Sequence, residues 1–163
     1  MLTVVVTGDR EAEDRLRSMP AELRLGLQRK MTTLSMKLYR HILMDKLSGQ
    51  VLRTVSGRLK RSIVERTVDN GDRIVSEIYS DGSAPYANIH EYGGKTAAHD
   101  IVATKAEALS FLRDGKRVFY KRVHHPGSRM PERSYMRSAL EDMQEEIISE
   151  LTKTYEEALR SAK

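Results

Sequence analysis

Apolar residues recur every three or four positions over a long stretch in the first third of the chain. Within residues 20–48 these positions are Leu23, Leu27, Met31, Leu34, Leu38 and Ile42. Such spacing places the side chains on one face of an α-helix, so the pattern predicts a long amphipathic helix. Pro20 suits the first turn of this helix, and Gly49 is expected to end it.

A second stripe of this kind occupies the end of the chain. Its members are Met136, Leu140, Met143, Ile147, Leu151, Tyr155 and Leu159. The pattern predicts a long C-terminal helix whose apolar face needs a partner, either the rest of the fold or another subunit.

The clearest β pattern surrounds Asn70 and Gly71. Two β-prone segments, residues 62–69 and 72–79, flank this pair. Both central residues of a two-residue type I′ turn need positive φ, which Asn and Gly tolerate. The pattern therefore predicts an antiparallel hairpin with a type I′ turn.

Further short elements are expected along the chain. In order they are a strand over residues 2–7, a helix over 11–18, a helical segment near 85–92, a loop opened by Gly93 and Gly94, and a second hairpin formed by 109–112 and 117–123 around a turn at 113–116. Together these elements predict one α+β domain over residues 1–163, in which a long helix in the N-terminal half and a long C-terminal helix pack on an antiparallel sheet of about four or five strands.

Composition excludes several classes of chemistry. Cysteine is absent from the 163 residues, so there is no disulfide, no thiolate metal site and no thiol nucleophile. No apolar run approaches the roughly 20 residues that a membrane helix requires, and the start of the chain has no basic leader. We therefore expect a protein that makes no membrane contact.

Charge is unevenly distributed along the chain. The net charge is +5, but residues 132–163 hold 8 acidic and 5 basic residues. A basic body with an acidic end suits either contact with a polyanion or head-to-tail packing between subunits. A solvated helix that is acidic by chance would show the same pattern.

A search for catalytic motifs finds none that is complete. The sequence H-E-Y-G-G at residues 90–94 lacks the second histidine of a zinc-protease helix. His90, His99 and His125 with nearby carboxylates match no known metal-site spacing, and Ser128 beside His125 lacks the strained turn of a nucleophile elbow. We expect a protein without enzymatic activity, metal or cofactor.

Residues 95–129 leave a nucleic-acid contact open. Eight basic residues lie there against three acidic ones, and Phe119 and Tyr120 lie among them. Basic and aromatic side chains together can contact phosphates and stack on bases. The alternative is an edge hairpin that its lysines and arginines keep soluble.

Three segments resemble motifs of the virion-morphogenesis and tail-completion proteins of tailed bacteriophages. Residues 50–63, Q-V-L-R-T-V-S-G-R-L-K-R-S-I, resemble a T-G-x-L-x-x-S-I motif. Residues 86–94, Y-A-N-I-H-E-Y-G-G, resemble Y-A-x-x-H-E-F-G-G, and residues 125–140 are similar to an H-P-G-x-x-x-P-x-R-x-F-L-R-x-A-L ending. The three segments occur in the expected order and cover residues 50–140.

The resemblance implies a structural subunit that forms a ring, six-fold by expectation, at the head–tail junction or the head-proximal end of the tail. Its partners would be other copies of itself, head-connector or tail-tube proteins, and double-stranded DNA passing through the lumen. It would be found in the virion, after assembly in the cytoplasm of the bacterial host. The competing interpretations are a small basic nuclease or toxin-like enzyme and a plain DNA-binding module.

The matched segments supply the candidate subunit-interface residues. They are Tyr86, His90, Glu91, Gly93, Gly94, Lys121, Arg122, His125, Pro126, Gly127, Pro131 and Arg133. Gly93 and Gly94 are expected to take positive φ, and Glu91 is expected to form an ion pair with Arg133, within or between subunits. Pro126 and Pro131 would set the entry angle of the last helix. Each of these residues could instead serve only to maintain the fold.

Overall fold

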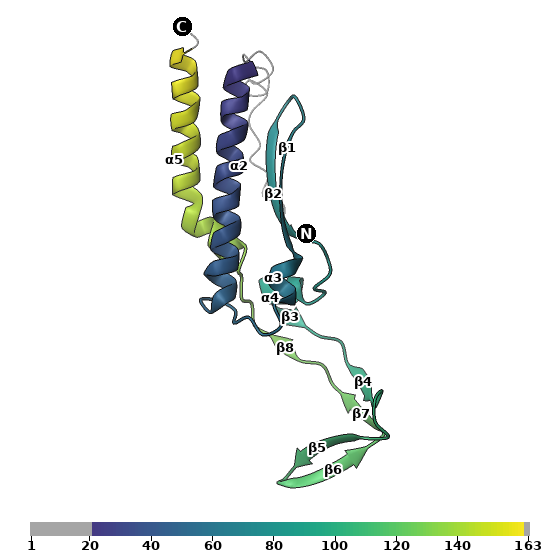
Figure 1. The fold of residues 1–163 in the computed structure, drawn as a ribbon. Helices are drawn as coiled ribbons and strands as arrows, with labels where there is room; N and C mark the ends of the chain where they lie inside the picture. Colours follow the sequence, from purple (N-terminus) through teal and green to yellow (C-terminus); the bar gives the residue numbers. More distant parts are fainter. Residues whose placement is uncertain (1–20, 162–163) are drawn as a thin grey trace.

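Two long antiparallel helices form one side of the molecule (Figure 1). The computed structural model describes residues 21–161, in which α2 spans Ala21–Met44 and α5 spans Arg137–Ser161. Leu27, Leu34 and Met143 of the predicted apolar stripes are buried. Both long helices are therefore confirmed over the described residues, but the first ends at Met44 and not at residue 48, because residues 46–48 form a separate 3₁₀ helix before Gly49. Pro20, the strand expected over residues 2–7 and the helix expected over 11–18 lie outside the described residues.

Charged residues along the seam between α2 and α5 add ion pairs to this contact. Lys30 Nζ lies 2.9 Å from Glu150 Oε2, Lys37 pairs with Glu146, and the buried Lys46 lies 2.6 Å from Asp142 Oδ2. Three acidic residues of α5 are thus paired with cations of α2 and of the segment that follows it.

A β-hairpin packs on α2, which lies between the hairpin and α5 in Figure 1. Its strands are β1 (Ile63–Asp69) and β2 (Ile74–Ser80), paired from Ile63 with Ser80 to Asp69 with Ile74. The predicted hairpin is confirmed. Its predicted type I′ turn is wrong, because the turn holds four residues, 70–73, and Asn70 does not have positive φ.

Asp69 explains the longer turn. One carboxylate oxygen accepts the backbone N–H of Gly71 at 2.9 Å, and the other accepts Nε–H of Arg24 from α2 at 2.7 Å. These contacts hold the end of β1 to the helix and favour a turn closed by a side chain over the tighter two-residue turn.

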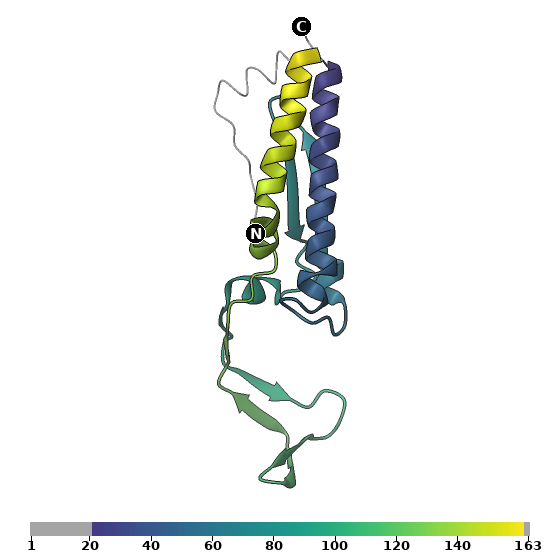
Figure 2. The ribbon, with the colours of Figure 1, turned by 90° about the vertical axis from the view of Figure 1, so that its left-hand side faces the viewer.

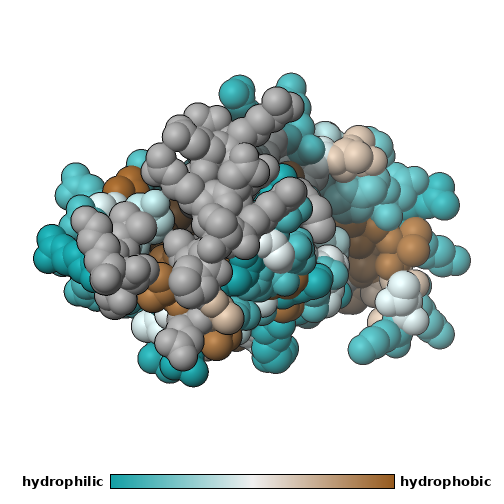
Figure 3. All heavy atoms as spheres, turned by 90° about the horizontal axis from the view of Figure 1, so that it is seen from above, coloured by the Kyte–Doolittle hydropathy of each residue, from teal (hydrophilic) through white to brown (hydrophobic). Residues whose placement is uncertain are grey.

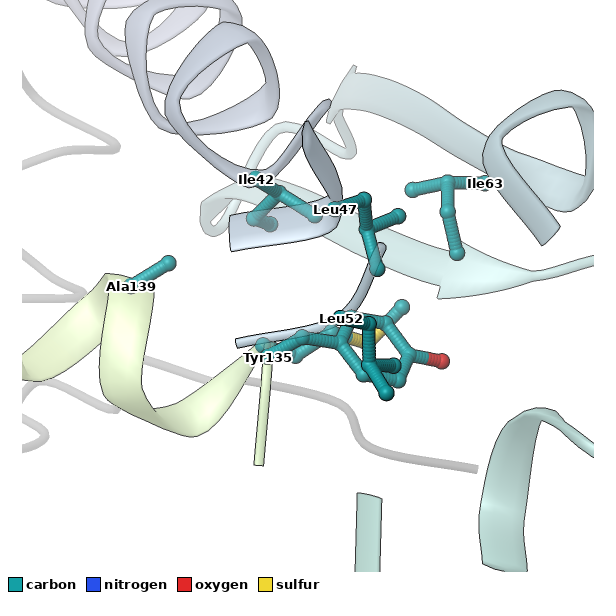
Figure 4. Close-up of a cluster of buried hydrophobic side chains, with 7 residues drawn as sticks. Ile42, Leu47, Leu52, Ile63, Tyr135 and Ala139 are labelled. Atoms are coloured by element: carbon teal, nitrogen blue, oxygen red, sulfur yellow. The ribbon is translucent and has the colours of Figure 1, made fainter. Parts of the chain in front are cut away.

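The core lies where α2 ends and α5 begins. After α2 the chain forms a short 3₁₀ helix, η1 (Lys46–Ser48), and then returns under the hairpin. The buried apolar cluster consists of Ile42, Leu47, Leu52, Ile63, Tyr135, Met136 and Ala139. Figure 4 shows the side chains of Leu47, Leu52 and Tyr135 pointing toward one another in this cluster. Two short helices, α3 (Arg58–Ser62) and α4 (Ala87–Tyr92), lie at the same end (Figure 1).

Residues 94–130 leave this body as an extended two-stranded ribbon, here called the arm (Figures 1 and 2). It contains three antiparallel strand pairs in succession. They are β3 (Gly94–Lys95) with β8 (Arg129–Met130), β4 (His99–Val102) with β7 (Arg122–His125), and β5 (Leu109–Arg113) with β6 (Lys116–Tyr120).

The α+β class is confirmed, but the expected sheet of four or five strands is wrong. Within residues 21–161 the strands form four separate two-stranded pairs. The helix α4 and the glycines 93 and 94 separate β2 from β3, so the later strands pair only with one another, away from the hairpin. The strand expected over residues 117–123 is two strands, β6 and β7, which break at Lys121 and have different partners.

The two-residue turn occurs instead at the tip of the arm. Asp114 and Gly115 join β5 to β6 with φ of 51° and 76°. Asp and Gly are residues that type I′ turns favour. No helix in the described part of the chain is both long and apolar enough to cross a membrane.

Candidate interaction site at the base of the arm

The arm exposes large apolar side chains that the body does not cover. Phe119 and Leu112 are 65% and 69% exposed, and Ile101, Val102, Phe111 and Tyr120 are each more than a third exposed. In Figure 3, which looks down along the helices, brown hydrophobic groups lie among teal ones on the distant part at the right, where the arm lies. An apolar surface on this scale is typical of protein contact sites.

Both faces of the outer hairpin carry apolar groups. Phe111 and Tyr120 lie on one face, with their rings stacked and the centroids 5.8 Å apart. The register places Leu112 and Phe119 on the opposite face, beside Arg117 and Ser110. Neither face covers a core, and an isolated two-stranded hairpin is marginally stable in water. The arm therefore has the properties of an element that is completed by another molecule.

Charge is concentrated on the arm as well. Its 37 residues hold 8 basic and 3 acidic residues, and the remainder of the chain holds 20 of each sign. Of the three acidic residues, Asp100 is engaged within the ribbon, with His124 Nδ1 at 2.9 Å and Arg122 at 3.5 Å from its carboxylate. The whole net charge of the protein thus comes from the arm.

Glu91 anchors the base of the arm to the body. Its carboxylate, 2% exposed, accepts the backbone N–H groups of Tyr135, Met136 and Arg137 at 2.8, 2.9 and 3.0 Å, and the Ser134 hydroxyl at 2.7 Å. These N–H groups open α5 and have no partner within the helix, so Glu91 caps the helix from α4.

The surroundings of Glu91 favour its charged form. Burial alone would raise its pKa, but the N–H groups of Met136 and Arg137, the Ser134 hydroxyl and the Tyr135 N–H together hold the pKa below its ordinary value. A carboxylate that accepts several N–H bonds is stabilised in this way even when it is buried.

The expected ion pair of Glu91 with Arg133 is wrong. Glu91 pairs with Arg137, whose Nε lies 3.4 Å from Oε1. Arg133 meets α4 through its backbone instead, where its N–H donates to the His90 carbonyl at 2.8 Å. With Glu91 buried on five donors, its carboxylate is also not available to another subunit.

Glycines near the base of the arm allow two segments of the chain to approach each other closely. Gly93 and Gly127 have φ of 68° and 85°. A Cβ at Gly93 would lie 2.8 Å from the Glu132 nitrogen, and one at Gly127 would overlap the Thr96 carbonyl. Gly94 also has positive φ, so the expectation for both Gly93 and Gly94 is confirmed.

A pocket of about 480 Å³ lies beside this junction, and all three motif segments line it. The first segment contributes residues 52–60, the second Tyr86 and His90, and the third Arg133. We call it the cationic pocket, because Arg53, Arg58, Lys60 and Arg133 line it and no carboxylate does.

The four cations of the pocket have no acidic partner in the described part of the chain. Arg58 Nε donates to the Ser83 carbonyl, and Lys60 Nζ donates to the Ser48 hydroxyl, both at 2.6 Å. His90 Nδ1 is buried without a hydrogen bond to any described residue. Burial lowers the pKa of His90, and the charge of Arg133 lowers it further.

The structure brings some of the predicted site residues together and separates others. Tyr86, His90 and Arg133 meet at the pocket, and Glu91, Gly93 and Gly94 lie beside it at the junction. His125 ends β7 with its ring stacked on His99 at 5.1 Å, and Pro126 and Gly127 follow it inside the arm. Pro131 follows β8, whereas Lys121 and Arg122 lie farther out.

Several residues of the site carry no distinctive signal in the sequence. Arg53, Arg58 and Lys60 belong to the first motif segment, yet nothing in their spacing singles them out. The partnership of Arg137 with Glu91 joins positions 46 residues apart, and only the fold makes it visible. Within residues 21–161 no group of three or more His, Asp or Glu side chains is placed to hold a metal ion.

Comparisons of the chain with protein-family models, with curated proteins and with solved structures found no match.

Proposed function

We propose that this protein is a structural subunit that assembles with copies of itself through its arm. The observation that carries the proposal is the arm itself, a ribbon with exposed apolar groups on both faces and no core. In a single copy that surface faces water at a cost of about 25 cal/mol for each Å². Contact with a neighbour removes it from water.

The place of assembly that we propose rests on the resemblance of the three motif segments to tail-completion proteins. On that basis the subunits form a ring at the head–tail junction or the head-proximal end of a phage tail, and DNA passes through the lumen. The meeting of all three segments at one pocket, and of the second and third at one helix cap, supports a shared structural role for them. A body with balanced charges and a basic arm also suits head-to-tail contacts between unlike surfaces.

The test is the oligomeric state of the purified protein. Mass photometry and negative-stain imaging are expected to show closed rings. Changing Leu112 and Phe119 to serine is expected to give monomers with an unchanged circular dichroism spectrum of the helices. Met44→Ser is the matched control, because Met44 is 68% exposed on the body and not on the arm. A wild-type protein that stays monomeric at all concentrations would overturn the proposal.

The alternative is a small basic nuclease or toxin-like protein that binds nucleic acid. The basic arm, with Phe119 and Tyr120 among its cations, favours this candidate. It predicts cleavage of DNA or RNA by the purified protein and loss of that activity in His125→Ala. A subunit of the proposed ring shows no such cleavage.

A further inference from the structure

The cationic pocket is unbalanced in a chain that otherwise pairs its charges. Lys30, Lys37 and Lys46 of α2 and η1 each face a carboxylate of α5, whereas Arg53 and Arg133 at the pocket face none among the described residues. Cations that converge without a counter-charge favour an anionic ligand. The pocket therefore has the charge of a site for an anionic ligand.

The other lining residues narrow the chemistry of that ligand. Leu47, Leu52 and Leu59 line the pocket together with the cations, and Val55 beside them is 97% exposed. Apolar groups of this kind favour a ligand that carries an aliphatic side chain next to its charge. An acidic segment of a protein has both features, whereas the phosphate backbone of DNA has only the charge.

The outer face of α5 offers such a segment. Glu141, Glu145 and Ile148 follow one another at helical spacing and form what we call the acidic ridge. All three are exposed, Ile148 by 57%, and neither glutamate has a partner among the described residues. At about 100° per residue, the ridge lies on the opposite side of α5 from the buried Met143.

We infer that the cationic pocket of one copy receives the acidic ridge of a second copy, with Arg53 and Arg133 facing Glu141 and Glu145. The two surfaces lie at different places on the same chain, so the contact is head-to-tail and propagates from copy to copy. The inference rests on the proposed self-assembly and names the surfaces that meet in it.

A charge exchange tests the inference on the full-length protein. The pocket variant carries Arg53→Glu and Arg133→Glu, and the ridge variant carries Glu141→Arg and Glu145→Arg. Each is expected to weaken self-association about 10- to 100-fold, because like charges then meet across the contact. An equimolar mixture of the two variants is expected to associate again in alternating order, because the acidic pocket of one meets the basic ridge of the other and the basic pocket of the second meets the acidic ridge of the first. One chain with all four changes is likewise expected to recover most of the wild-type affinity.

The control carries Arg29→Glu and Arg40→Glu, which change the same charge at exposed positions of α2. It is expected to assemble like the wild type, and circular dichroism is expected to show folded protein in every case. A four-fold variant that stays as weak as the single-surface variants would overturn the inference. So would a pocket variant that assembles normally but loses affinity for a short DNA duplex, because the anion would then be phosphate.

The outcomes separate the inference from the proposed function. If wild-type rings form and the arm variants break them, but the pocket and ridge variants do not, the inference falls and the proposed function stands. If the wild type never associates, both fall.

Discussion

The carboxylate of Glu91 accepts the backbone N–H of Met136 at 2.9 Å, so a side chain from α4 caps the first turn of α5. The two residues stand on opposite sides of the arm in the sequence, one just before it and one just after. The contact therefore closes the base of the arm and joins it to the core, in which Met136 and Tyr135 are buried.

Removing this cap is expected to destabilise the body. Glu91→Ala leaves three buried N–H groups and Ser134 without an acceptor, and we expect the free energy of unfolding to fall by about 3 kcal/mol. Glu91→Gln keeps one acceptor oxygen and is expected to cost about half as much. Urea denaturation followed by circular dichroism measures both. Glu156→Gln is the matched control on an exposed site outside both proposed contact surfaces, with an expected change of less than about 0.5 kcal/mol. Equal stability of Glu91→Ala and the control would contradict the role of the cap.

The carboxylate of Glu91 also makes the free energy of unfolding depend on pH in the acid range. The pKa of Glu91 in the folded protein lies below its ordinary value of 4.5, so the stabilisation is present above that value and is lost as pH falls through the folded pKa. Asp69, held by Arg24, contributes with the same sign. Thermal melting between about pH 3 and 7 is expected to show a decline only in the acid range, and a smaller decline in Glu91→Gln. If the melting temperature of Glu91→Gln falls with pH as steeply as that of the wild type, other carboxylates cause the loss of stability in acid.

Two glycine substitutions are expected to act in opposite directions. At Gly127, with φ of 85°, an added Cβ overlaps the Thr96 carbonyl, so Gly127→Ala is expected to break the ribbon next to β3 and β8. At Gly26, inside α2, an added Cβ would meet no other described residue within 4 Å beyond the backbone of the helix itself, and Gly26→Ala is expected to raise the free energy of unfolding by about 0.5–1 kcal/mol. Hydrogen exchange at the Thr96 amide, which donates to Ser128, reports the first effect. Unchanged protection there would show that the arm adapts to the extra methyl group.

The sequence predicts the helices far better than the sheet, for a physical reason. The stripes of α2 and α5 face each other, so each helix supplies the apolar surface that its partner requires. For the strands, the residue pattern indicates extended backbone but not which strand is the neighbour. Phe111 and Tyr120 belong to strands expected in the sheet, yet their rings stack on each other outside the core.

The site shows the same division between local and distant information. The positive φ of Gly93 and Gly94 could be predicted, because short helices often end at such residues. The ion-pair partner of Glu91 could not be predicted, because Arg133 and Arg137 belong to the same motif segment and nothing in the sequence favours one over the other. In the structure Glu91 pairs with Arg137, which belongs to the helix that Glu91 caps.

Assembly is expected to protect the arm from hydrogen exchange. In a separate subunit, the amides of residues 94–107 belong to a ribbon without a core and are expected to exchange much faster than those of α2. In the ring they are expected to slow, while the α2 amides keep their protection. Hydrogen exchange followed by mass spectrometry at low and high protein concentration gives both values. Equal exchange of the arm in the two samples would place it outside the contact.

Charge on the outer arm is expected to control how assembly depends on salt. Lys121 lies between β6 and β7 and is exposed, and Lys121→Glu is expected to weaken assembly because a basic arm favours contact with acidic groups of the neighbouring copy. The loss is expected to be largest at low salt, where screening is weakest, and to diminish toward about 1 M salt. Arg122→Glu is the comparison. The Arg122 guanidinium lies 3.5 Å from the Asp100 carboxylate, so this substitution also places two carboxylates side by side and is expected to loosen the pairing of β4 with β7 as well. Ring formation measured across a salt series tests this placement of the arm. Particles that assemble normally from Lys121→Glu but fail to retain or eject DNA would show that the arm faces the lumen.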